Sequence, residues 1–201
     1  GTVFWHGKGM IIWRELEKYL RDKLDHEGYE EVSTPIIVKK ELFEKSGHWQ
    51  HFQENMFTLE IDNTTYTLKP MNCPESTLIY SSRVRSYRDL PMRLSEITDR
   101  LHRNERSGTL GGLLRVRQFS QDDAHIFCTE DQIKSEISKC IDLILRIYKT
   151  FGFHEIKIGL STRPLDSMGS DELWEKAISS LKAALLENKI EYEVHEGGGA
   201  F

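Results

Sequence analysis

The sequence has no apolar run long enough to cross a membrane and only three cysteines in 201 residues. A membrane-spanning helix needs about 20 consecutive apolar residues, and the N-terminus lacks the charged start and apolar stretch of a signal peptide. A small, odd number of cysteines does not make a disulfide framework. We therefore expect Cys73, Cys128 and Cys140 to be reduced thiols in a cytoplasmic protein.

Basic residues are in the minority, 27 against 32 acidic ones, which gives a net charge of −5. Proteins that bind nucleic acid non-specifically are usually basic, so this class is disfavoured. Five arginines nevertheless lie between residues 100 and 117: Arg100, Arg103, Arg106, Arg115 and Arg117. Arginine rather than lysine favours bidentate recognition of phosphate or carboxylate. A solvated basic surface is the alternative interpretation.

Hydrophobic periodicity predicts an α+β protein with a largely antiparallel sheet. Helices are expected over Met10–Leu24, from Asn72, after a capping box at Thr129–Gln132, and over Asp171–Glu187. Strands are expected over Tyr29–Val38, Phe57–Ile61, Tyr66–Lys69, Leu101–Arg106, Leu114–Ile126, Ile156–Leu160 and Ile190–His195. The second and third of these should form a hairpin around Asp62-Asn63-Thr64. Pro35 cannot donate to a β-ladder, so the first of these strands should lie at an edge or be kinked.

The strand expected over Leu114–Ile126 carries chemically useful groups at every second position. Side chains alternate faces along a strand, so its odd-numbered residues share one side. They are Arg115, Arg117, Phe119, Gln121, Asp123 and His125. Arginines can bind phosphates, an aromatic ring can stack on a base, and a carboxylate can bind an amine. This set of groups is therefore suited to binding a nucleotide together with an amino acid. The neighbouring strand would add Arg103 and Glu105 on one face, whereas a solvated sheet face is the alternative.

Spacing alone does not identify a metal site. His125 and Cys128 are three residues apart, which sends their side chains to opposite faces of a strand. Cys73 could meet His125 only through the fold. The Gly-x-x-x-x-Gly-Lys phosphate loop, the Gly-x-Ser-x-Gly elbow and the His-Glu-x-x-His helix are all missing from the sequence.

Seven segments, in order and with compatible spacing, resemble the catalytic core of the threonyl-tRNA synthetases, a family of class II aminoacyl-tRNA synthetases. They are Phe4–His6, Glu31–Pro35, Ser46–Trp49, Lys69–Pro74, Ser86–Pro91, His102–Glu105 and Gln121–Phe127. The Met-Asn-Cys-Pro and Gln-Asp-Asp-Ala-His elements together distinguish this family from its seryl and prolyl relatives. The resemblance departs at Glu75-Ser76, where the family commonly has Gly-His.

The resemblance implies that residues 1–201 are the N-terminal part of a class II catalytic domain, with motifs 1 and 2. It implies activation of L-threonine by ATP to threonyl-adenylate and transfer to the 3′ end of threonine tRNA. The family's motif 3, anticodon-binding domain and editing domain are not represented in these residues, so we expect the chain alone to be inactive. Motif 1, the helix from Met10 and the strand ending at Pro35, implies a homodimer. A non-catalytic paralogue or fragment that binds tRNA or an amino acid is the alternative.

The same resemblance implies roles for an ATP-binding set. Arg103 would act as the catalytic arginine on the α-phosphate, and Glu105 would lie near the adenine amino group. Arg115 would reach the γ-phosphate, and Phe119 would stack on adenine. Val116 completes the set, and Mg²⁺ would accompany ATP.

A second set implied by the resemblance concerns threonine and zinc. Met71, Gln121 and Asp123 would line the threonine pocket, with Asp123 holding the substrate hydroxyl or amine. Cys73 and His125 match two of the three protein ligands of the family's Zn²⁺. The third ligand in family members is a histidine beyond residue 201.

Overall fold

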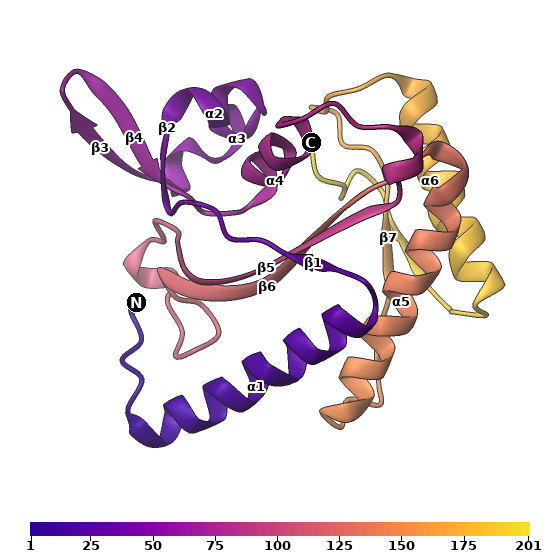
Figure 1. Ribbon diagram of the computed structural model, residues 1–201, viewed down its shortest axis with the longest axis horizontal. Coiled ribbons are helices and arrows are strands. Elements are labelled where there is room, and N and C mark those ends of the chain that lie inside the picture. The colour runs from indigo at the N-terminus through magenta and orange to yellow at the C-terminus, as the bar shows by residue number, and fades with distance from the viewer. The chain divides into compact units, whose positions relative to one another are not determined.

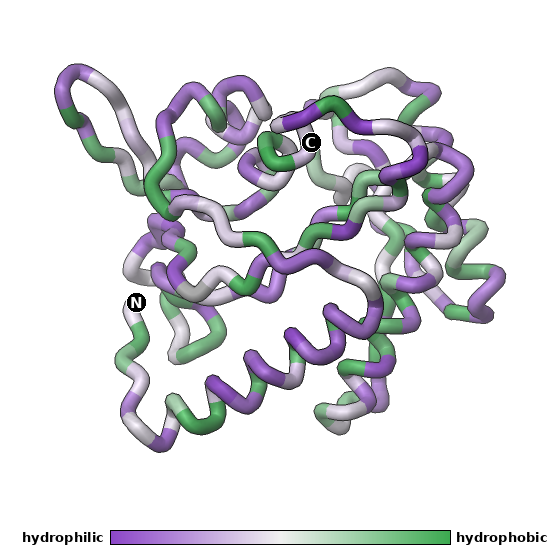
Figure 2. Tube along the Cα trace, viewed as in Figure 1, coloured by the Kyte–Doolittle hydropathy of each residue, from purple (hydrophilic) through white to green (hydrophobic). Residues whose placement is uncertain are grey.

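The apolar stripe near the N-terminus forms α1 (Gly7–His26) in the computed structural model, which describes residues 1–201 apart from the side chain of Asp99 (Figure 1). Hydrophobic and hydrophilic residues alternate along this helix (Figure 2). Lys23 and His26 lie in its last turn, where positive charge complements the helix dipole. Gly28, with φ of 77°, adopts the left-handed conformation that commonly ends a helix. The predicted helix is confirmed, with its start at Gly7 rather than Met10.

The chain divides into two compact units, Gly1–Phe127 and Cys128–Phe201. The first unit holds two three-stranded sheets with strand orders β1-β5-β6 and β2-β4-β3, and the second holds a two-stranded sheet, β7-β8. Most strand pairs in the first unit are antiparallel, which confirms the predicted α+β class. Within the described part of the chain, no helix combines the length and apolar character needed to cross a bilayer.

The strand predicted over Tyr29–Val38 is wrong, because the structure breaks it into β1 (Glu30–Glu31) and β2 (Ile37–Lys39). β1 pairs in parallel with β5, whereas β2 pairs antiparallel with β4 in the other sheet. Pro35 lies between them and cannot donate to either ladder. The expected kink is therefore a passage of the chain from one sheet to the other.

The two central strands also differ from their predicted bounds. β5 (Met92–His102) begins nine residues before the predicted Leu101, and β6 (Gln118–Phe127) begins after the predicted Leu114. β5 escapes a pattern search because polar side chains such as Glu96 and Thr98 are buried within it. Its register with β6 shifts between Thr98 and Leu101.

The second sheet of the first unit contains the predicted hairpin. β3 (Phe57–Ile61) and β4 (Thr64–Leu68) are joined by Asp62 and Asn63, both at positive φ, as a tight two-residue hairpin turn requires. The remaining helical elements of this unit are α2 (Lys40–Lys45), α3 (His48–Phe52), α4 (Cys73–Ser81), η1 (Gln53–Asn55), η2 (Tyr87–Asp89) and η3 (Ser107–Thr109). Pro74 lies in the first turn of α4, where its missing N–H costs no helix hydrogen bond.

In the second unit, α5 (Ile133–Thr150) packs against α6 (Asp171–Glu187). The predicted capping box is present: Thr129 and Gln132 bond reciprocally around η4 (Glu130–Gln132). The two strands predicted here are shorter than expected, at β7 (Gly159–Ser161) and β8 (Glu193–His195), and they pair in parallel.

Candidate active site

The face of the β5–β6 ladder that carries Asp123 contains several of the predicted site residues. Directly opposed residues of an antiparallel pair point to the same face. Glu96 lies opposite Asp123, Thr98 opposite Gln121, and Leu94 opposite His125. Gln121, Asp123 and His125 therefore share one face, as the alternation in the sequence predicts.

The carboxylate of Asp123 is held by two hydrogen bonds from different elements. The Asn72 side-chain amide donates to its Oδ2 at 3.1 Å, and the Ala124 backbone N–H donates to its Oδ1 at 2.9 Å. Asn72 is fully buried and immediately precedes α4, so this bond brings the start of α4 to the strand. An asparagine before a helix start is typical of a cap, so the sequence pattern does not mark Asn72 as a site residue.

Cys73, the first residue of α4, lies near the Asp123 carboxylate. Burial raises the pKa of the Cys73 thiol, and the negative charge of Asp123 raises it further. The thiol and the carboxylate are thus near enough to interact, although they are fifty residues apart in the sequence. α4 also contacts β6, the strand that carries His125.

The donors present here suit zinc, since thiolate and imidazole are its usual protein ligands. Cys73 and His125 would supply one of each. Among the side chains that the structure describes, no three His, Cys, Asp or Glu groups lie close enough together to hold a metal ion. Cys73 and His125 are thus a thiol and an imidazole on two elements that contact each other.

The two other predicted threonine-binding residues flank this cluster. Met71 is half-buried and adjoins Asn72 in the chain. Gln121 is exposed on β6, opposite the buried Thr98. The fold therefore brings both predicted residues to the neighbourhood of Asp123.

A buried ion pair underlies the cluster. Lys69 Nζ lies 3.1 Å from Glu96 Oε1, and the two side chains are 0% and 5% exposed. Thr34 donates both its backbone N–H and its hydroxyl to the same carboxylate, at 2.9 and 3.0 Å. These contacts fix the end of β4, just before Met71, against β5.

Glu75, where the family commonly has glycine, is a buried carboxyl group. Its side chain is 3% exposed, and neither oxygen accepts a hydrogen bond from any residue that the structure describes. Burial raises the pKa of Glu75 to about 7, with the charge of Lys69 opposing the shift and that of Glu96 adding to it. An ionised carboxylate without a donor is costly in such surroundings.

Replacing the Glu75 carboxyl group should therefore stabilise the folded protein at alkaline pH. The folded protein binds the Glu75 proton more tightly than the unfolded chain does, so its free energy of unfolding falls as pH rises from 4.5 to about 7. Glu75→Gln removes this loss, and we expect a gain of roughly 3 kcal/mol at pH 8, with little gain at pH 4. Thermal unfolding of the full-length protein at both pH values measures it. The exposed Glu175→Gln on α6 is the control, and an equal gain at both pH values would contradict the assignment.

Arg103 lies immediately after β5, so the predicted strand over Leu101–Arg106 is wrong at this residue. Its backbone N–H donates to the carbonyl oxygen of Arg117 at 2.8 Å, which continues the pairing by one bond. Its side-chain Nε is buried and donates no hydrogen bond to the described residues. A buried guanidinium N–H without an acceptor suits an anionic ligand.

Arg115 and Glu105 pair with each other. Arg115 donates from Nε and Nη2 to Glu105 Oε2, at 3.1 and 3.0 Å. Both line a cavity of about 500 Å³, together with Glu54, Asn55, Asn104, Arg106 and Thr109. Arg115 and Arg117 precede β6, so the predicted alternation does not extend to them. Arg117 instead bonds the Glu105 carbonyl and the Ser107 hydroxyl, at 2.9 and 3.1 Å.

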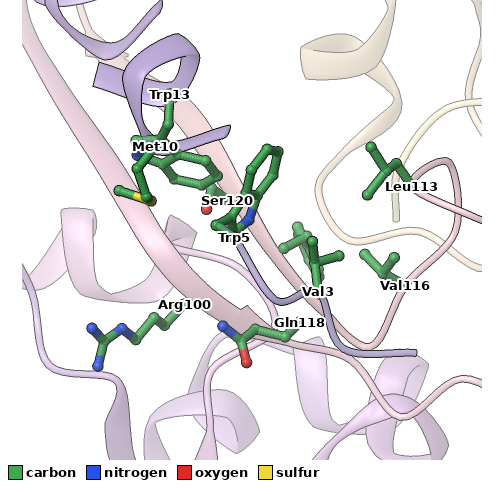
Figure 3. Close-up of a pocket in the computed structure, with 10 residues that line it drawn as sticks. Val3, Trp5, Met10, Trp13, Arg100, Leu113, Val116, Gln118 and Ser120 are labelled. Atoms are coloured by element: carbon green, nitrogen blue, oxygen red, sulfur yellow. The ribbon is translucent and has the colours of Figure 1, made fainter. Parts of the chain in front are cut away.

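Val116 and Phe119 line a different cavity, of about 470 Å³. Its other residues are Val3, Trp5, Met10, Trp13, Arg100, Leu113, Gln118 and Ser120 (Figure 3). The rings of Trp5 and Trp13 meet edge to face with their centroids 5.0 Å apart. The fold thus divides the predicted ATP-binding residues between two cavities.

Comparison with known proteins identifies relatives over the whole chain. The class II tRNA synthetase core domain family (G, H, P, S and T) matches residues 57–195. Over 201 residues the chain is 51% identical to the threonine–tRNA ligases of Methylobacillus flagellatus and Nitrosomonas europaea. Each of these matches covers 100% of this chain but only 32% of the relative, so the chain spans about a third of the relatives' length.

A solved structure, the RNA binding domain of threonyl-tRNA synthetase from Cryptosporidium parvum, has the same fold. It superposes with a TM-score of 0.92 at 40% identity, covering 100% of this chain and 50% of that one. The chain therefore belongs to the class II tRNA synthetase core domain family, in which it matches threonyl-tRNA synthetases over its whole length.

Proposed function

We propose that the full-length protein carrying this chain is a threonine–tRNA ligase. It activates L-threonine with ATP to threonyl-adenylate and transfers the threonyl group to the 3′ end of threonine tRNA. The observation that carries this proposal is the 51% identity to threonine–tRNA ligases across all 201 residues. The hydrogen bond from Asn72 to Asp123, which joins the Met-Asn-Cys-Pro and Gln-Asp-Asp-Ala-His segments, supports it.

Activation requires little acid–base chemistry, since positioning and charge stabilisation dominate such transfers. The threonine carboxylate attacks the α-phosphorus of ATP, the bond to the bridging oxygen breaks, and pyrophosphate leaves. The guanidinium of Arg103 binds the α-phosphate and offsets the negative charge that grows there during this step. Glu105 and Arg115 bind the adenine amino group and the γ-phosphate, which requires their mutual ion pair to rearrange. Phe119 stacks on adenine beside Val116, which requires the separate cavities that hold these residues and Glu105 to join around the nucleotide. Mg²⁺ would accompany the phosphates.

The residues around the start of α4 and on the facing part of β6 select threonine. Asp123 holds the hydroxyl or amine of the substrate, and Met71 and Gln121 line the pocket. Cys73 and His125 would hold a Zn²⁺ ion, which when bound supplies a Lewis-acid contact for the substrate. A purely apolar pocket cannot separate threonine well from the isosteric valine, whereas a site built for a hydroxyl can.

The proposed protein is a homodimer formed through α1 and the strand segment ending at Pro35. Ile11 and Ile12 on α1 are 63% and 62% exposed, and Leu16 one turn later is 41% exposed. Trp5, just before the helix, is also exposed. An apolar surface of this kind supports burial against a second copy.

The proposal is tested by amino-acid-dependent pyrophosphate–ATP exchange with the full-length protein. We expect exchange with threonine, weaker exchange with serine, and none above background with proline. Binding of tRNA or threonine without any exchange would favour a non-catalytic paralogue. Exchange that depends on proline instead would contradict the proposed substrate.

A further inference from the structure

Asn72 occupies the N-cap position of α4 but does not cap the helix. Asparagine is among the preferred N-cap residues because its side-chain oxygen accepts a backbone N–H of the first turn. Here that side chain accepts no hydrogen bond from the described backbone at the start of α4. It is instead fully buried, at 0% exposure. The residue thus forgoes a contact that normally stabilises a helix, and its side chain serves another purpose.

The amide of Asn72 bridges two strands. Thr98 of β5 donates its hydroxyl to Asn72 Oδ1 at 3.2 Å, and Asn72 Nδ2 donates to Asp123 Oδ2 of β6 at 3.1 Å. The opposite amide orientation would place Oδ1 against the Asp123 carboxylate, where two acceptors repel. The charge of Asp123 therefore selects one orientation of the amide, because a carboxylate can only accept. The hydroxyl of Thr98, which is 4% exposed, then anchors Oδ1 by donating to it.

The bridge fixes the direction of the Asp123 carboxylate. One carboxylate oxygen accepts a hydrogen bond from the Ala124 backbone N–H, and the other accepts one from the Asn72 side-chain amide. Hydrogen bonds to an ionised acceptor are stronger than neutral ones. A carboxylate held in this way loses little freedom when a ligand binds, which favours affinity and selectivity.

We propose that Asn72, anchored by Thr98, is a positioning residue that aims the Asp123 carboxylate at the amino-acid substrate and so sets selection for threonine. The inference rests on the proposed function. It assigns no contact between Asn72 and the substrate, because the amide acts through Asp123. Its consequence is specific to the amino acid, since ATP is assigned to other residues.

The test uses the full-length protein in threonine-dependent exchange, with KM measured separately for threonine and ATP. Thr98→Val removes the hydroxyl that anchors the amide and keeps the side-chain shape, whereas Thr98→Ser keeps the hydroxyl. Asn72→Asp replaces the donor by a second carboxylate while retaining a good N-cap residue. Thermal unfolding of each variant shows whether it is folded.

Loss of a hydrogen bond to a charged group corresponds to about a 10-fold to 100-fold effect. We expect Asn72→Asp to raise KM for threonine by that factor, and Thr98→Val, which removes a bond between neutral groups, to raise it by about 3-fold to 10-fold. KM for ATP should change less than about twofold in both variants, and Thr98→Ser should keep the parental value. Discrimination of threonine against valine should fall in parallel.

A folded Thr98→Val variant with unchanged KM for threonine would overturn the inference, even if Asn72→Asp fails to fold. An equal rise of both KM values would also overturn it, since a merely structural role would give that result. Absence of threonine-dependent exchange in the unsubstituted protein would overturn the proposed function, and this inference with it.

Discussion

Arg103→Ala in the full-length protein is expected to lower threonine-dependent pyrophosphate–ATP exchange by about 100-fold to 1000-fold, the usual loss when a transition-state donor is removed. The structural reason is the buried Nε of Arg103, which finds no acceptor among the described residues. Its backbone is fixed by the bond to Arg117, so the side chain is presented from a rigid position. Arg103→Lys should restore only part of the rate, because lysine keeps the charge and loses the planar fork.

The matched control for this prediction is Arg83→Ala, which removes an exposed arginine shortly after α4. Its exchange rate should stay close to that of the unsubstituted protein. Thermal unfolding of Arg103→Ala separates a chemical defect from loss of fold. Exchange within about threefold of the parental rate would show that the role assigned to Arg103 is wrong.

Cys73→Ser is expected to strip Zn²⁺ from the full-length protein and to abolish discrimination between threonine and valine. Serine keeps the size of the side chain but is a much poorer zinc ligand than a thiolate. Catalytic zinc sites have three protein ligands and an exchangeable position, and this chain offers Cys73 and His125 as two of the three. ATP binding should be nearly unchanged, because the ATP-binding set is separate.

Elemental analysis measures the zinc content of this variant independently of its activity, and valine-dependent exchange measures the lost discrimination. Cys128→Ser is the control, since Cys128 is half-buried and lies in the second unit. That variant should retain zinc and selectivity. Stoichiometric zinc in Cys73→Ser would remove Cys73 from the ligand set.

Local signals in the sequence were enough to predict many elements of the fold. The apolar stripe of α1, the Asp62-Asn63 turn and the Thr129–Gln132 capping box all depend on neighbours within a few residues. Each such signal reflects a local free-energy preference, so it can be interpreted without the rest of the chain. The motif residues likewise showed the family, which the comparisons confirm.

A strand that buries polar side chains is not predictable in the same way. β5 buries Glu96 and Thr98, and its pattern therefore lacks the alternation that marks a half-buried strand. Pro35 signalled a break in its segment, but the two sheets that receive β1 and β2 are chosen by pairing with strands far along the chain.

The sequence by itself determined which chemical groups this protein has, the order of its motifs, and the shared face of Gln121, Asp123 and His125 on β6. Only the tertiary structure decided that Asn72 forgoes its cap to join Thr98 and Asp123, across 26 and 51 residues. It also decided that Lys69 and Glu96 pair in the interior and that Glu75 is buried without a donor. The physical reason is that such contacts depend on strand register and burial, which are fixed by the packing of the whole unit and leave no periodic trace in the sequence.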